Sequence, residues 1–456
     1  MKTPIGLFVT MLVLAVTPTR VEGRRYLDER KFTIHPAPIG ADPLQYRLLP
    51  AVADQTPGNA ATLYLASFHW AGEINADKTF KELGDVPPDA PLDLGENAVR
   101  MVDGRPFVRE NLLLAARRTW CVWDTSFREQ GINALLPWLS DARTLANFMS
   151  LDARLRIRQK QYGEAILPLR AGFALADNLD RDPVAVQALI AIGIQSLMLR
   201  DVGLLVQQPG APNLYWPLAN LPALDRERGR VLELESASLF FTFPELRNPR
   251  QLSAERTRAV LENLPRLSGR AQDHEPAGTL LLMIRAYPVA KKYLLDSGTP
   301  AAEVEAMPAN SAVLAYWVAD YQKHTHQLQK WAGLPIWQIC QAYPGLEKTT
   351  EVAAETNPLL VVLDWSNRVF LQFGLVERER TMLQTVEAIR AYAATHEGRV
   401  PGSLDELSPD TPAPLDPLLD KPFEYEGSGG AATLRAPDPP GHPLNRETIY
   451  RITIAP

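Results

Sequence analysis

The sequence predicts a mainly α-helical protein, in which packed antiparallel helical hairpins surround a buried central helix and a small C-terminal α+β module follows. Three observations lead to this prediction. The run from Asp182 to Gln208 is apolar on nearly every side of a helix, which is typical of a buried helix. On both sides of that run, apolar residues return at the spacing of amphipathic helices. After residue 376, short alternating segments are separated by turn residues.

The central run has the start and stop signals of a helix. Asp182 fits an N-cap, and Pro183 follows at the first helical position, where its missing N–H costs nothing. Pro209-Gly210 ends the run. A membrane span needs about 20 mostly apolar residues, and polar residues interrupt this one, so a core helix of a soluble body is favoured. The interrupting residues are Gln187, Gln195, Ser196, Arg200 and Asp201.

Composition places the chain among ordinary globular proteins. It has 456 residues, of which 46% are hydrophobic and 22% charged, so it is long enough for more than one domain. A net charge of −6 gives no electrostatic reason to expect a nucleic-acid partner.

Residues 1–23 are expected to form a signal peptide. Lys2 supplies a positive charge, and the apolar run Ile5–Val16 has the length of a signal-peptide core. Val21 and Gly23 are small residues before a cleavage after Gly23. An uncleaved anchor remains an alternative, because three arginines lie close to that site: Arg20, Arg24 and Arg25. A buried N-terminal helix is a further alternative. We expect the body to be exported, to the periplasm or the cell envelope, and a membrane contact only through such an anchor.

Residues 24–55 are expected to be an irregular N-terminal arm, because Pro36, Pro38, Pro43 and Pro50 lie close together. A helical body is then expected over residues 56–375. Its first helix should start at Thr56-Pro57, and its buried face should hold Ala60, Tyr64, Phe68 and Ala71.

Further helices are expected over residues 96–118 and 131–139, and a longer one capped by Ser140. The chain turns near Tyr162-Gly163, and the next residues resemble a tetratricopeptide repeat at its turn. The matching positions are Tyr162, Ala165, Leu169 and Gly172. Asp152 and Arg156 depart from that family, which prefers apolar and aromatic residues there. Because no second copy follows, we expect helical hairpins rather than a repeat array.

Helices should continue after the central run. They are expected to begin at Asn213 and to cover residues 225–243, 253–264, 279–295, 299–307, 311–331 and 359–373. The segment 279–295 is apolar and carries a basic patch at Lys291 and Lys292.

The C-terminal module is expected over residues 376–456. Its helix should end at Gly398, Ser403 and Glu406 fit a capping box, and a proline-rich loop follows. Residues 421–425 and 432–434 should pair as a hairpin around the turn Gly427–Gly430, and residues 450–454 alternate as a last strand.

This order of elements resembles the globular part of a type II secretion major pseudopilin. The matching residues are Ala388-Ile389-Arg390-Ala391-Tyr392, Gly398, Pro401, Leu404, Leu407, Asp416-Pro417 and Pro422-Phe423 with Tyr425. The resemblance implies one helix, a proline-rich loop and a small antiparallel sheet. The family's apolar N-terminal helix does not precede the module, and its calcium loop has no residue-by-residue match. The whole chain is also similar to large exported bacterial proteins of unknown function that join a helical body to such a tail.

No motif nominates a catalytic, cofactor-binding or metal-binding residue. His324 and His326 are the only close histidine pair, with Asp320 one turn before His324, but two histidines at i, i+2 of a helix point apart. Asp273-His274-Glu275 fits a solvated loop, and Gly427–Gly430 fits a turn rather than a phosphate loop. Cys121 and Cys340 are expected to be buried free thiols, with a disulfide as the alternative.

Aromatic residues gather in the segment 317–343. A groove for a peptide or glycan is one interpretation, but their spacing fits a helix–helix core and we favour the core. The residues are Trp317, Tyr321, Trp331, Trp337 and Tyr343.

We therefore expect an exported, non-catalytic binding or scaffolding protein with a protein partner in the envelope. One alternative is an all-helical polysaccharide-active enzyme that uses paired carboxylates in an aromatic-lined cleft. Another is an accessory protein that docks to a secretion filament.

Overall fold

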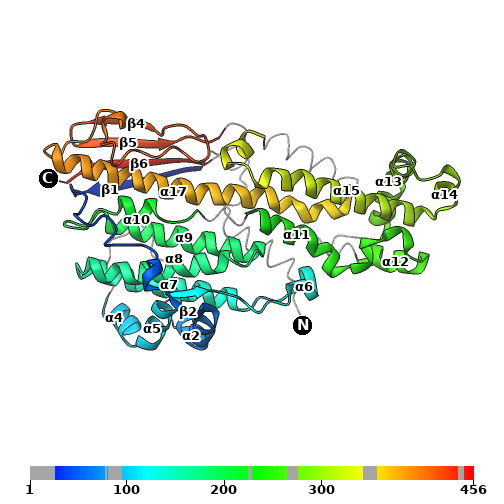
Figure 1. Ribbon diagram of the computed structural model, residues 1–456, viewed down its shortest axis with the longest axis horizontal. Helices are drawn as coiled ribbons and strands as arrows, with labels where there is room; N and C mark the ends of the chain where they lie inside the picture. Colours follow the sequence, from blue (N-terminus) through cyan, green and yellow to red (C-terminus); the bar gives the residue numbers. More distant parts are fainter. Residues whose placement is uncertain are drawn as a thin grey trace. The chain divides into compact units, whose positions relative to one another are not determined.

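The computed structural model describes residues 26–77, 80, 95–223, 228–263, 276–342, 357–439 and 446–455. The fold is mainly α-helical with a small four-stranded mixed sheet, as the sequence predicts (Figure 1). The described residues fall into two compact units. The terminal unit holds both ends of the described chain, in the segments 22–123, 137–227 and 371–456. The inserted unit is interposed in the sequence, in the segments 124–136 and 228–370.

Helical hairpins form the body of the terminal unit. Helices α7 (Trp138–Arg158), α8 (Tyr162–Asp180) and α9 (Ala185–Leu205) follow one another through short connections and pack together. The first connection turns at Lys160, whose φ of 58° lets Gln161 N–H reach Arg156 O at 2.9 Å and so satisfies carbonyls at the end of α7. The remaining helices of this unit are η1 (Val52–Asp54), α2 (Ala60–Ala76), α4 (Glu96–Asp103), α5 (Pro106–Ala116), α10 (Tyr215–Ala219), η8 (Leu404–Glu406) and most of α17 (Asp364–Thr395).

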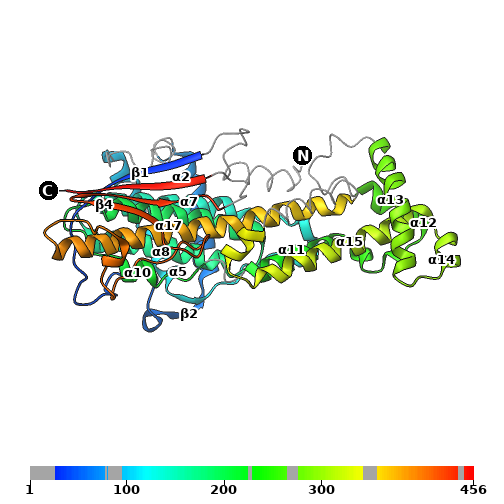
Figure 2. The same cartoon turned by 90° about the horizontal axis from the view of Figure 1, so that it is seen from above.

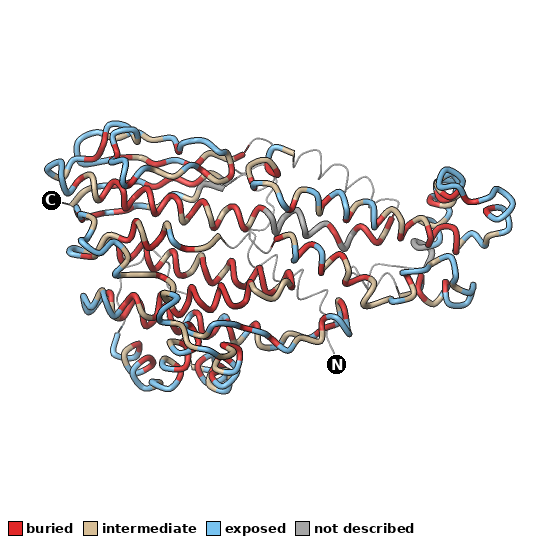
Figure 3. Tube along the Cα trace, viewed as in Figure 1, coloured by how far each residue is buried: buried red, intermediate tan, exposed pale blue. Residues whose placement is uncertain are grey.

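Helix α9 is the predicted buried central helix. Among the described residues it is the one helix long and apolar enough to cross a membrane, yet 78% of its apolar window is buried within the structure. Figure 3 shows α8 and α9 buried along most of their length. A Cβ at Gly172 of α8 would lie 2.1 Å from Sδ of Met198, so these two helices approach closely where α8 has no side chain.

The start of α9 differs from the prediction. The helix begins at Ala185, with Val184 as its N-cap residue. The carbonyl of Asp182 instead accepts a hydrogen bond from Val184 N–H at 2.7 Å, so residues 182–184 form a tight turn before the helix. The cap-then-proline signal was therefore wrong by two residues.

The predicted irregular arm at 24–55 is wrong over its first residues. Strand β1 (Tyr26–Ile34) pairs in parallel with the last strand, β6 (Arg446–Ile454), in the register Tyr26↔Arg446 to Ile34↔Ile454 (Figure 2). The strand ends before the first of the closely spaced prolines. Phe32 and Ile34 are buried and Lys31 and Thr33 are exposed, so the period-2 pattern was present in the sequence.

The sheet has the order β1-β6-β5-β4. The predicted hairpin is present as β4 (Glu424–Ser428) and β5 (Ala431–Ala436), and β5 pairs antiparallel with β6. Helix α17 runs beside the sheet (Figures 1 and 2). Helix α9 meets both, since a Cβ at Gly203 would lie 3.5 Å from Phe32 of β1 and 3.7 Å from Leu383 of α17.

The predicted boundary at residue 376 is wrong. The segments 359–373 and 376–395 were expected to be separate, but α17 is one helix from Asp364 to Thr395, and Gly374 does not interrupt it. The C-terminal module also belongs to the same compact unit as β1 and the hairpins α7–α9. The predicted helical body and tail are therefore not separate domains.

Smaller differences concern helix ends. Residues Thr56–Asn59 form β2, paired with β3 (Arg118–Trp120), and the Asn59 side chain caps α2 by accepting from Ala61 N–H. The expected helix at 96–118 is split by a turn at Gly104-Arg105 into α4 and α5. Helix α7 begins at Trp138, before Ser140. Ser403 makes no side-chain cap, although Glu406 Oε2 accepts from Gly402 N–H at 3.0 Å.

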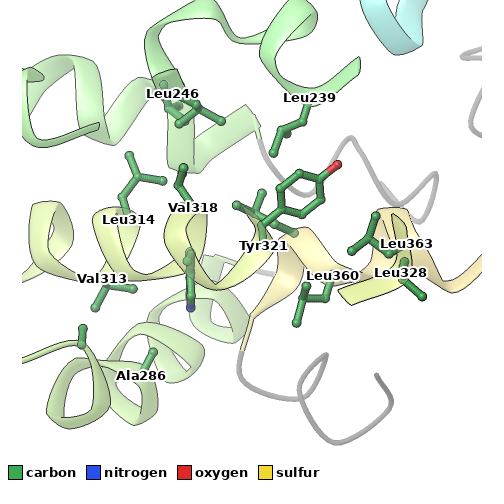
Figure 4. Close-up of a cluster of buried hydrophobic side chains, with 14 of the residues drawn as sticks. Leu239, Leu246, Ala286, Val313, Leu314, Val318, Tyr321, Leu328, Leu360 and Leu363 are labelled. Atoms are coloured by element: carbon green, nitrogen blue, oxygen red, sulfur yellow. The ribbon is translucent and has the colours of Figure 1, made fainter. Parts of the chain in front are cut away.

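Helix α15 (Ala309–Ala332) lies at the centre of the inserted unit. It packs against α11 (Arg228–Thr242), α12 (Ala254–Asn263) and α13 (Pro276–Asp296). The core between them is aliphatic and aromatic, and Figure 4 shows ten of its members by name. The other elements are α6 (Phe127–Gln130), η2 (Gly131–Asn133), η4 (Pro244–Arg247), η5 (Pro249–Gln251), α14 (Ala301–Ala306), a short helix over 336–342 and η7 (Pro358–Leu363).

Candidate functional site

The aromatic residues of the segment 317–343 belong mainly to the core, as the sequence favoured. Trp317 and Tyr321 are fully buried among the apolar residues of α11, α13 and α15. The Tyr321 hydroxyl donates to Ser236 O at 3.1 Å. Trp331 and Trp337 are half-buried, and Tyr343 lies outside the described residues. Their arrangement gives no support to an aromatic-lined catalytic cleft.

The two histidines of α15 point apart, as expected. His324 Nδ1 lies 3.4 Å from Asp320 Oδ1, and Asn357 Nδ2 donates to the other Asp320 oxygen at 3.0 Å. His326 is exposed. The hydrogen bond to Asp320 raises the pKa of His324. Burial opposes ionisation of Asp320, but its hydrogen bonds with His324 and Asn357 lower its pKa. The pair is a local ion pair, and no group of three metal-ligating side chains occurs among the described residues.

The remaining sequence candidates are structural or outside the described chain. Cys121 and Cys340 are free and buried, and burial raises the pKa of the Cys121 thiol to about 12, so it is a poor nucleophile. Gly427–Gly430 includes the turn between β4 and β5, where Gly429 has a φ of 61°. The expected loop Asp273-His274-Glu275 lies outside the described residues.

Several buried carboxylates of the terminal unit are paired with arginines. Asp152 accepts from Arg109 at 2.7 Å and from Arg156 at 3.0 Å, which explains why these positions depart from a tetratricopeptide repeat. Three further pairs are Arg154–Asp201, Arg378–Asp416 and Arg30–Glu379, at 2.6, 2.9 and 2.6 Å. Burial raises the pKa of Asp201 and Asp416, against the effect of their arginines. Each carboxylate is occupied in holding helices, strands or loops together.

One of these groups forms what we name the terminal clamp, which consists of His35, Ala37, Ala211, Asn213, Glu387 and Arg390. The Glu387 and Arg390 side chains are fully buried and 2.8 Å apart. Arg390 also donates to His35 O and Ala211 O, both at 3.0 Å. Asn213 Nδ2 donates to Ala37 O and Glu387 O. The clamp joins the segment after β1, the loop before α10 and helix α17.

The most unusual surface of the described residues lies on α13. Of the large hydrophobic residues exposed in the inserted unit, all except Leu135 lie on this helix, each between 45% and 61% exposed. Aliphatic residues that are exposed close together on one helix make this surface the candidate interaction site of the described residues. We name this set the α13 surface: Leu280, Leu281, Ile284, Val289 and Leu295.

The inner side of α13 explains why its large residues point outward. Ala286, Ala290 and Leu294 are fully buried and recur every four residues, so they form the inward face. Figure 4 shows Ala286 on the side of α13 that faces Val313 of α15. Helix α13 therefore packs inward with two alanines and Leu294, and leaves five other aliphatic side chains exposed.

Basic residues accompany the α13 surface. Arg285 and Lys292 are exposed between its aliphatic members, and Lys291 lies at its edge. Lys292 Nζ is 2.6 Å from Asp296, and Lys291 Nζ is 2.5 Å from Glu305 of α14. The sequence showed the apolar character and the lysines of this segment. It did not show which face of α13 is buried. The spacing of Ala286 and Ala290 was the one pattern in the sequence that could have indicated the buried face.

No match to this chain was found among protein-family models, curated proteins or solved structures.

Proposed function

We propose that this chain is an exported, non-catalytic binding or scaffolding protein of the cell envelope, and that it docks through the α13 surface. The observation that supports binding is the exposure of five large aliphatic side chains on one helix. Burying such residues is favourable by about 25 cal/mol per Å² of apolar surface, so a partner that covers them gains affinity. Export rests on the signal-peptide pattern of residues 1–23.

The positions of the aromatic residues do not support the alternative of a polysaccharide-active enzyme. It required Trp317 and Tyr321 to line a cleft beside paired carboxylates, and both side chains are buried in the inserted unit. Docking to a secretion filament remains supported by the order of α17, proline-rich loop and antiparallel strands, which resembles a pseudopilin in sequence. No contact of the described residues favours it over the α13 surface.

Site-specific photo-crosslinking in the native envelope tests the binding function. A benzoylphenylalanine in place of Ile284, on the α13 surface, should give strong crosslinks to a component outside the chain. The same residue in place of Gln322, an exposed position of α15 in the same unit, is the matched control. We expect crosslinks from position 284 and few from position 322. Equal yields at both positions, or none at either, would contradict the proposal.

A further inference from the structure

Three of the five members of the α13 surface form a stripe with cations on both sides. At 100° per residue, Leu281, Ile284 and Leu295 fall within a sector of about 60°, together with the exposed Pro288. Lys291 flanks this sector on one side, and Lys292 with Arg285 on the other. Helix α13 carries these three cations and a single carboxylate, Asp296, in its described side chains. The apolar sector itself contains no acidic residue.

Both lysines form surface ion pairs, and Lys291, whose side chain is 26% exposed, also places Nζ 5.7 Å from the centre of the Tyr287 ring. The side chains of Lys292 and Asp296 are 77% and 63% exposed, and Glu305, the partner of Lys291, is 69% exposed. Exposed ion pairs contribute little, because water and salt screen them. These ammonium groups can therefore exchange their carboxylates for other anions, and their aliphatic stems can extend along an apolar phase while the charges stay in its polar boundary.

We propose that the α13 surface binds an anionic lipid surface, with α13 lying in the plane of the membrane boundary. The inference rests on the proposed binding function and names its partner. Leu281, Ile284 and Leu295 enter the region between headgroups and acyl chains, and Arg285, Lys291 and Lys292 contact lipid phosphates. An apolar sector flanked by cations is the arrangement by which helices lie on anionic membranes.

The dimensions of the stripe favour a membrane over a second copy of the chain. From residue 281 to 295 the stripe is about 21 Å long and about 10 Å wide, which gives roughly 210 Å². A stable protein interface needs about 800 Å² on each partner. A second copy would also place the two sets of cations close together, whereas phosphates of an anionic bilayer complement them.

An environment-sensitive fluorophore at position 284 reports on this contact directly. Cys121 and Cys340 are buried, so an Ile284→Cys variant of the full-length chain can be labelled selectively with bimane under native conditions. We expect a blue shift with vesicles of phosphatidylcholine and phosphatidylglycerol, and little change with phosphatidylcholine alone. A Gln322→Cys label is the control and should not shift. Because the readout is local, binding through the predicted N-terminal apolar segment does not imitate it.

Variants separate the apolar and electrostatic contributions. In a chain labelled at position 284, replacing Leu281 and Leu295 by Ser should weaken binding at least tenfold. Replacing Arg285, Lys291 and Lys292 by Gln should weaken it severalfold and remove its dependence on salt. Circular dichroism checks the fold, and Val52→Ser, an exposed change in the terminal unit, should leave the shift intact.

The outcomes distinguish this inference from the binding function. If the label at 284 does not shift with anionic vesicles, or shifts equally with neutral ones, the lipid inference is wrong. A protein crosslinked from position 284 would then leave the binding function standing with a different partner. A concentration-dependent dimer in sedimentation, lost in the Leu281→Ser and Leu295→Ser variant, would replace the membrane by a second copy. If position 284 neither shifts nor crosslinks, both proposals fail.

Discussion

The terminal unit buries several ion pairs, whereas the inserted unit gathers most of its exposed large apolar side chains on one helix. Arginine–carboxylate pairs lie within the terminal unit at Arg378–Asp416, Glu387–Arg390 and Arg154–Asp201. The inserted unit is packed around Trp317, Tyr321 and aliphatic residues, and its buried Arg228 donates to the carbonyls of Ala332 and Leu334. Five aliphatic residues of its helix α13 remain exposed.

The difference follows from what each unit must join. The terminal unit brings together segments from the two ends of the chain, such as Arg30 with Glu379 and His35 with Arg390. Buried ion pairs are directional and poorly tolerate a wrong partner, so they specify which segments meet, even when their net stabilisation is small. The inserted unit joins helices that are closer in sequence, and apolar packing is sufficient for it.

Breaking the terminal clamp should cause the largest loss of stability, and the loss should be confined to the terminal unit. Arg390→Met leaves the Glu387 carboxylate buried without its cation and removes the bonds to His35 O and Ala211 O. Removal of one partner of a buried pair typically costs about 3–5 kcal/mol. Amide hydrogen exchange resolved by mass spectrometry should show lost protection in β1 and α17, with protection of α15 retained.

Two variants make the clamp experiment decisive. Arg399→Met removes an exposed arginine that pairs with Glu397 at the surface, and its cost should stay below about 1 kcal/mol. Glu387→Gln combined with Arg390→Met should be less destabilised than Arg390→Met alone, because no buried charge remains. A loss below about 1 kcal/mol for Arg390→Met itself would show that the clamp does not hold the terminal segments.

A smaller effect is expected where helices α8 and α9 approach. In Gly172→Ala the new methyl group would overlap Met198, and overpacking of this kind costs about 1–3 kcal/mol. Gly193→Ala in α9 is a matched control, because nothing lies within 4 Å of the added carbon. It should be neutral or stabilising by up to about 1 kcal/mol. Hydrogen-exchange rates in α8 and α9 measure the change in stability of both variants. Equal changes in Gly172→Ala and Gly193→Ala would contradict the close approach of the two helices.

Local patterns in the sequence predicted much of the fold. Helices α9, α12 and α15 and the hairpin β4–β5 follow from the spacing of nearby residues, so one stretch of chain contains the signal. Strand β1 was missed because its partner β6 stands at the other end of the chain and the prolines after Ile34 dominated the segment. The pairs Arg30–Glu379 and Glu387–Arg390 are not visible as buried from sequence, because charged residues are usually exposed.

The candidate site shows a different limit of the sequence. Apolar residues occur all round α13, so periodicity alone does not decide between the face with Ala286 and Ala290 and the face with Ile284 and Leu295. In the structure the face with the alanines, which also carries Leu294, packs inward. Which face is buried depends on the shape of the neighbouring helix, and that information is not local to α13.

The inserted unit should be less sensitive to losing one polar contact. Tyr321→Phe removes the hydroxyl that donates to Ser236 O inside the core of the inserted unit and keeps the ring. A single neutral hydrogen bond contributes about 1 kcal/mol, so the loss should be clearly smaller than in Arg390→Met. Hydrogen exchange of α11 and α15 provides the measurement. A loss as large as that of the clamp variant would mean that polar contacts dominate both units.

The smallest effect should depend on pH and arise from His324. Its pKa is raised above the ordinary value of 6.5 by Asp320, so its stabilising effect is present below about pH 6.5 and is lost as the pH rises through the folded-state pKa. The lowered pKa of Asp320 sets the acidic limit. The stabilisation from the Asp320 carboxylate is lost as the pH falls below 3.8, the ordinary pKa of an aspartate. Between these limits the native protein should be more stable than His324→Gln, and the difference should shrink towards zero in alkaline solution. His326→Gln, which replaces an exposed neighbour on the same helix, is the matched control. Urea unfolding at several pH values measures this difference, and hydrogen exchange locates it in α15. The same pH profile for His324→Gln and His326→Gln would contradict the ion pair.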